Sequence, residues 1–85
     1  MSSSIMETQL IRSLQAEPEL ARRGCNITAA TNAGVLISRA GRHRGLWAWR
    51  DGDFAFTPHG AAEPAIEVDT VAEAVQYTLR VVCPD

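Results

Sequence analysis

The sequence predicts an α+β fold of two layers, in which an antiparallel meander sheet of four to five strands has an N-terminal and a C-terminal helix packed on one face. Apolar residues recur at helical spacing near both ends of the chain, and they alternate with a period of two in between. The strongest hairpin signal lies in residues 47–56, where two aromatic runs flank an Asp-Gly pair. The expected order is therefore α-β-β-β-β-(β)-α, and residues 1–85 are expected to form a single domain.

The N-terminal helix is predicted to begin at Ser4, because Ser4 and Glu7 have the spacing of a capping box. Its apolar residues form a narrow stripe, at Met6, Leu10, Ile11 and Leu14. Pro18 interrupts this helix, since proline lacks an amide hydrogen and disfavours the helical conformation in the residue before it. A short second helix is expected over residues 19–23, ended by Gly24 in the left-handed conformation.

The first strand pair is predicted from the alternation of residues 25–31 and 35–38, which a three-residue loop at residues 32–34 connects. Residues 39–45 form a polar segment with glycines in it, a composition typical of loops. We therefore expect this segment to connect the first hairpin to the second one.

The second hairpin is predicted to place four aromatic residues on one side of the sheet. A two-residue Asp-Gly turn at positions 51–52 pairs Trp49 with Phe54 and Trp47 with Phe56. Two interpretations are open: the rings are the core face of the sheet under the helices, or they form a stacking platform for bases or another ligand. We expect the core, because two amphipathic helices need an apolar surface and the other strands offer few large side chains.

The C-terminal helix is predicted to begin at Thr70, because Glu73 follows three positions later as in a capping box. A short edge strand, residues 65–68, is expected before it. The helix has a full apolar stripe, at Val71, Ala74, Val75, Thr78, Leu79 and Val82. Pro84 is expected to end it.

Composition and net charge are those of a globular protein without a general affinity for nucleic acid or membranes. Apolar residues make up 46% of the chain and charged residues 21%, close to the averages of globular proteins. The net charge of −2 gives no general attraction to nucleic acid or to an acidic membrane. No apolar run approaches the ~20 residues of a membrane span, and the start lacks the basic and apolar regions of a signal peptide. We expect a cytoplasmic bacterial protein without a membrane partner.

The sheet face opposite the aromatic residues is predicted to be smooth and mildly apolar, with no further element to cover it. Its candidate interface residues are Leu36, Leu46, Ala48 and Ala55. We therefore predict a non-catalytic accessory or protein-interaction module. Its partner is either a second copy of the chain, which gives a homodimer, or a different protein.

The densest charge cluster is a candidate anion-binding site, made of Arg39, Arg42, His43 and Arg44. Guanidinium groups beside a histidine suit phosphate or carboxylate, and loops carry many binding residues. The alternative function is thus a binder of nucleic acid or of a phosphorylated small ligand. The other interpretation is a solvated connection between strands, and nucleic acid is not the partner that we favour.

No motif in the chain indicates catalysis, a cofactor or a metal. Phosphate loops, dinucleotide fingerprints and the common hydrolase motifs are absent. The possible metal ligands lack the close spacing of a zinc site; they are Cys25, His43, His59 and Cys83. Both cysteines are expected to be free thiols, and the position of Cys83 at a helix C-terminus is expected to raise its pKa. We therefore expect no enzyme activity, no cofactor and no metal.

Overall fold

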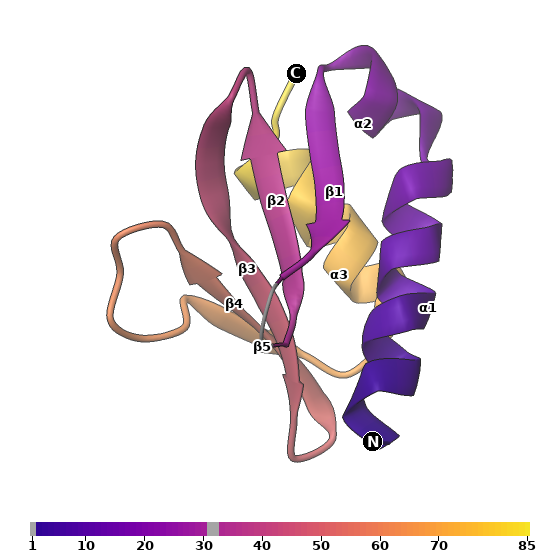
Figure 1. The fold of residues 1–85 in the computed structure, drawn as a ribbon, viewed down its shortest axis with the longest axis vertical. Coiled ribbons are helices and arrows are strands. Elements are labelled where there is room, and N and C mark those ends of the chain that lie inside the picture. The colour runs from indigo at the N-terminus through magenta and orange to yellow at the C-terminus, as the bar shows by residue number, and fades with distance from the viewer. Residues whose placement is uncertain (1, 31–32) are drawn as a thin grey trace.

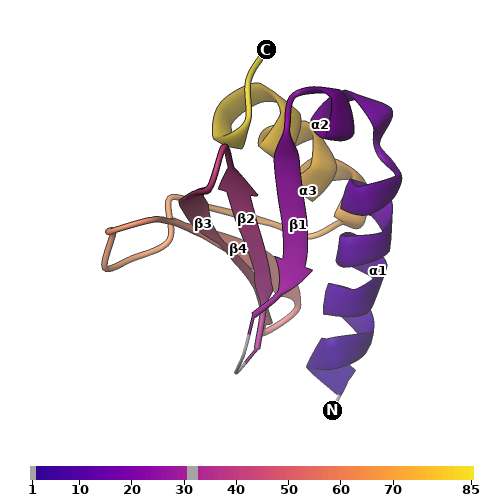
Figure 2. The ribbon, with the colours of Figure 1, turned by 45° about the horizontal axis from the view of Figure 1, so that its top comes forward.

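The computed structural model describes residues 2–30 and 33–85, and its five strands form one antiparallel sheet with the order β1-β2-β3-β4-β5. The strands are β1 (Cys25–Ala29), β2 (Val35–Arg39), β3 (Arg42–Arg50), β4 (Asp53–Pro58) and β5 (Ile66–Val68). The helices are α1 (Ser2–Ala16), α2 (Pro18–Arg22), α3 (Val71–Tyr77) and the π-helical turn η1 (Thr78–Val82). All of them lie on one side of the sheet (Figures 1 and 2), which confirms the predicted α+β fold.

The aromatic side chains of the second hairpin form the core under these helices. Trp47 and Phe54 are fully buried and Phe56 almost so. The ring centroid of Trp47 lies 6.4 Å from that of Phe54 and 5.1 Å from that of Phe56. The predicted pairs Trp47↔Phe56 and Trp49↔Phe54 are present. α1 and α2 add leucines to the same core, at Leu10, Leu14 and Leu20.

The turn of this hairpin has the predicted conformation. Asp51 and Gly52 have φ angles of 52° and 85°, and a type I′ turn requires positive φ at both positions. Arg50 and Asp53 are the paired residues on either side of it. The Asp-Gly pair thus sets the register of β3 and β4.

The connection between β2 and β3 differs from the prediction. β2 extends to Arg39 and β3 begins at Arg42, so the loop expected over residues 39–45 is wrong. Ala40 and Gly41 alone make the turn, with φ angles of 55° and 78°. An alanine at a left-handed position is rare because its Cβ is crowded there, so Ala40-Gly41 is not a residue pair typical of a two-residue turn.

The start of the chain also differs from the prediction. α1 begins at Ser2, so Ser4 lies inside the helix and the capping box expected at Ser4 and Glu7 is wrong. The carboxylate of Glu7 instead accepts hydrogen bonds from the backbone amides of Gly34 and Trp49, each 3.0 Å long. Glu7 therefore holds α1 against the ends of two strands.

The break after α1 and the first hairpin agree with the prediction. α2 begins at Pro18, and Gly24 follows it with a φ of 81°. β1 pairs with β2, and the amide of Ala30 donates to the carbonyl of Gly34 across the connection, at 3.0 Å. Thr31 and Asn32, predicted at the end of the strand and in the loop, lie outside the described residues.

The C-terminal helix has the predicted cap but not the predicted end. The hydroxyl of Thr70 accepts a hydrogen bond of 3.1 Å from the amide of Glu73. From Thr78 the chain is π-helical, and the amide of Cys83 donates to the carbonyl of Thr78 at 2.9 Å. The α-helix expected through Val82 is therefore wrong in its last turn. Val82 and Cys83, at the end of this turn, are both buried.

Candidate interaction surfaces

The four residues of the predicted anion site do not converge on one point. In the β2–β3 ladder Arg39 lies opposite Arg42, whereas His43 is one position further along β3 and faces the other side of the sheet. Arg44 is the unpaired residue of a β-bulge. Anion binding by this segment therefore stays a prediction, and it would have to use residues on two faces.

The guanidinium group of Arg39 is fixed by hydrogen bonds to backbone carbonyls. Its Nε donates to the carbonyl of Arg23 at 3.1 Å, and its Nη1 donates to the carbonyl of Pro84 at 2.6 Å. Arg23 acts in the same way, with Nη1 donating to the carbonyls of Leu79 and Cys83 at 2.8 and 3.0 Å. The two guanidinium groups together tie the end of η1 to the segment between α2 and β1.

The two cysteines, far apart in the sequence, are neighbours in the core. Both are free and buried. Burial, and next the hydrogen bond with the Cys25 thiol, raise the pKa of Cys83 to about 12, against a smaller opposite effect of Arg39 and Arg44. The direction of this pKa shift is the predicted one, but its main cause is burial rather than the helix end. Such a thiol is a poor nucleophile at neutral pH.

The open face of the sheet, which we define as the face without helices, carries the predicted interface residues together. Leu36 is the cross-strand partner of Leu46, and Ala48 is the partner of Ala55. They form one apolar patch at the centre of the sheet. Ala55 is buried and the other three are partly buried. Their role as an interface stays a prediction.

A hollow of about 300 Å³ borders the open face near Leu36 and Leu46. The rings of His43 and His59 stack at its edge, with centroids 5.7 Å apart and planes at 25°. His59 follows β4, and its amide donates to the carbonyl of Arg44 at 3.0 Å. Sequence reasoning did not predict this pair, because it depends on how far β3 and β4 pair beyond the hairpin.

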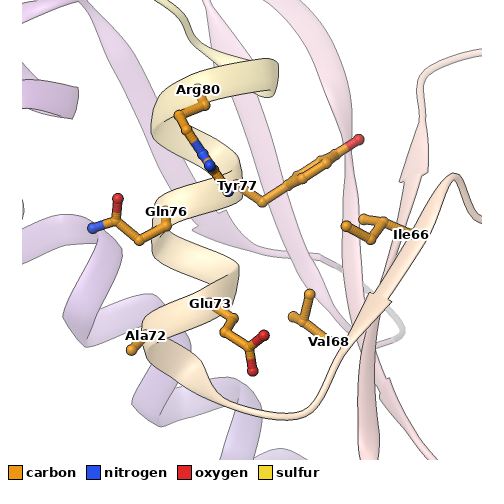
Figure 3. Close-up of a pocket in the computed structure, with 7 residues that line it drawn as sticks. All are labelled: Ile66, Val68, Ala72, Glu73, Gln76, Tyr77 and Arg80. Carbon is orange, nitrogen blue, oxygen red and sulfur yellow. The ribbon is translucent and has the colours of Figure 1, made fainter.

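A second hollow, of about 360 Å³, lies between β5 and the C-terminal helix, and we call it the β5–α3 groove (Figure 3). Ile66 and Val68 line it from the sheet. The helical side consists of Ala72, Glu73, Gln76, Tyr77 and Arg80. The ring of Tyr77 lies 5.9 Å from that of Trp47 and 5.8 Å from that of Phe56, so this wall is anchored in the core.

Sequence reasoning also missed this groove. β5 was expected only as a short edge strand, and Gln76, Tyr77 and Arg80 fall outside the apolar stripe of the helix. The available signal was the large ring of Tyr77 beside that stripe, since an aromatic residue there needs a surface to pack on.

Within residues 2–30 and 33–85, no three His, Cys, Asp or Glu side chains are grouped so that they could hold a metal ion. None of the described helices is long and apolar enough to span a bilayer.

Comparisons with known proteins give no match. No family model matches the chain, and no curated protein and no solved structure is significantly similar to it.

Proposed function

We propose that the chain is a non-catalytic interaction module that forms a homodimer through the open face of its sheet. The observation that supports it most directly is that every described helix lies on one side of the sheet (Figure 2), over the aromatic core, so that no described helix covers the partly buried apolar patch around Leu46. An antiparallel sheet often has one solvated face, but that face is then usually polar. An apolar centre is typical of a surface that meets a partner.

Charges beside the β3–β4 turn favour a second copy as this partner. Arg50 and Asp53 are cross-strand partners, and the alternation of the strands puts them on the same face as Ala48 and Ala55. A two-fold axis parallel to the strands, between β3 and β4, places Arg50 of one copy over Asp53 of the other. The small side chains in the centre let two sheets approach to the usual distance of about 10 Å.

The experiment measures mass by light scattering over a range of micromolar concentrations. We expect a dimer for the unchanged chain and a monomer for Leu46→Glu, which puts a charge into the centre of the patch. Val81→Glu is the matched control, because Val81 is 55% exposed and lies on η1, on the helix-covered side. A monomeric mass of the unchanged chain at high micromolar concentration contradicts the proposal.

A charge exchange tests the arrangement within the dimer. Arg50→Asp places two acidic groups against each other and is expected to weaken the dimer. Adding Asp53→Arg restores an opposite pair across the axis, so the double variant is expected to regain most of the affinity. Additive losses in the double variant would show that these residues do not meet across the interface.

A further inference from the structure

The β5–α3 groove lies beside a free strand edge. β5 is the last strand of the sheet in the order β1-β2-β3-β4-β5, so one side of its backbone pairs with β4 and no strand of the described residues lies on the other side. Arg50 and Asp53 flank the two-residue turn as a hydrogen-bonded pair, and in an antiparallel ladder such pairs alternate with pairs that are not hydrogen-bonded to each other. The backbone N–H and C=O groups of Phe54 and Phe56 therefore point away from β3 and towards β5. The same alternation directs the amide and carbonyl of Glu67 outward, and no described residue binds them.

The floor of the groove is apolar. Ile66 and Val68, on either side of Glu67, point towards α3, and Tyr77 closes the helical side (Figure 3). Both β5 side chains are partly buried. An added strand that pairs with Glu67 therefore places alternate side chains over this floor, as in other cases of strand addition next to a helix.

Opposite charges stand at the two ends of the groove. Glu73 lies near Val68, and Arg80 lies at the other end of the helical side, beyond Tyr77 (Figure 3). At 1.5 Å per helical residue their backbones are about 10 Å apart. In an extended strand, the side chains of residues i and i+4 point to the same side, and their backbones are about 13 Å apart. Long side chains at these two positions of a bound segment can therefore reach Glu73 and Arg80. Arg80 forms no ion pair with any described residue.

We propose that the β5–α3 groove binds an extended segment of a partner protein, which adds antiparallel to β5 and has the pattern basic, any, apolar, any, acidic from its N- to its C-terminal end. Antiparallel addition continues the pairing of every other strand in this sheet. In this direction the basic residue meets Glu73, the apolar one packs on the floor and the acidic one meets Arg80. This surface is separate from the open face, so the proposal does not depend on the homodimer.

The test is a titration of the full chain, labelled with ¹⁵N, with the peptide acetyl-Lys-Thr-Val-Thr-Glu-amide, which has no terminal charges. We expect saturable changes of chemical shift in β5 and α3, with the amide of Glu67 among the most affected. Absence of saturation at millimolar peptide, or changes confined to the open face, would overturn the proposal. A reversed peptide that binds more tightly would overturn the stated direction.

Charge variants make the test specific. Arg80→Glu is expected to weaken binding of this peptide by about fivefold, the effect of replacing an exposed attraction by a repulsion. A peptide with lysine in place of its glutamate is expected to bind this variant better than it binds the unchanged chain. Arg12→Glu, the same change on the exposed surface of α1, is expected to leave the affinity unchanged. If both variants lost the same affinity for the peptide, the change in net charge alone would explain the loss, and the role of Arg80 would be refuted.

Discussion

The indole Nε1 of Trp47 donates a hydrogen bond of 3.0 Å to the hydroxyl of Thr78, and both side chains are fully buried. That hydroxyl donates in turn to the carbonyl of Ala74, at 2.8 Å. The two bonds join the aromatic hairpin to the C-terminal helix at the residue where η1 begins. A buried tryptophan brings a donor into the core, and Thr78 supplies the acceptor that the donor needs.

Replacing Thr78 by valine should therefore destabilise the protein more than replacing it by serine. Thr78→Val keeps the volume but leaves the indole N–H unpaired, and we expect a loss of about 1–3 kcal/mol in the free energy of unfolding. Thr78→Ser keeps the hydroxyl and loses one methyl group, about 0.8 kcal/mol. Urea unfolding measures both. A valine variant as stable as the unchanged chain would contradict this role of the hydrogen bond.

Glu7 is expected to stabilise the protein because it links α1 to the sheet. Its two carboxylate oxygens accept from the amides of Gly34 and Trp49, and the residue is 8% exposed. Glu7→Gln turns one acceptor into a donor that faces an amide, so we expect a loss of about 1.5–3 kcal/mol in urea unfolding. Gln9→Ala, on the exposed side of α1, is expected to change stability by less than about 0.5 kcal/mol. Similar effects of the two changes would refute the anchoring role.

The elements that could be predicted from the sequence are those whose signals are local. The Asp51-Gly52 turn fixes the β3–β4 register within ten residues, and the alternation around it assigns the aromatic side chains to one face. The Thr70 cap is likewise visible in four consecutive residues. Each of these signals consists of a few consecutive residues, so it predicts the same turn or cap whatever the rest of the fold.

The features that could not be predicted depend on contacts across the fold. Glu7 has the spacing of a capping box, yet its partners lie 27 and 42 positions later in the chain. Arg39 looks like part of a polar loop, yet its guanidinium binds a carbonyl at Pro84. The β5–α3 groove arises from the placement of a three-residue strand beside a helix. No local pattern specifies such placements, because they are set by how the layers pack.

Gly45 is a position where a side chain should not be tolerated. A Cβ there would overlap the ring of Phe56 and lie 2.6 Å from the carbonyl oxygen of Thr57. We expect Gly45→Ala to cost about 2–3 kcal/mol, because the core cannot accept the extra methyl group without a backbone shift. Gly60→Ala is the control: its Cβ meets no atom within 4 Å, and only its φ of 86° costs energy, about 1 kcal/mol. Guanidinium unfolding followed by tryptophan fluorescence compares them, and equal losses would exclude the steric clash.

The raised pKa of Cys83 predicts that the stability of the protein declines at alkaline pH. Burial, and next the hydrogen bond with Cys25, raise the pKa of its thiol to about 12, whereas a thiol in an unfolded chain titrates near about 8.5. The folded state therefore keeps a proton that the unfolded state loses, so the contribution of this thiol is complete below the unfolded pKa and declines as the pH rises towards the folded one. Between about pH 8.5 and about pH 10 the stability advantage of the unchanged chain over Cys83→Ala should shrink by about 1 kcal/mol per pH unit. Urea unfolding of both chains across this range tests it, and a constant difference would show that the Cys83 thiol titrates normally in the folded protein.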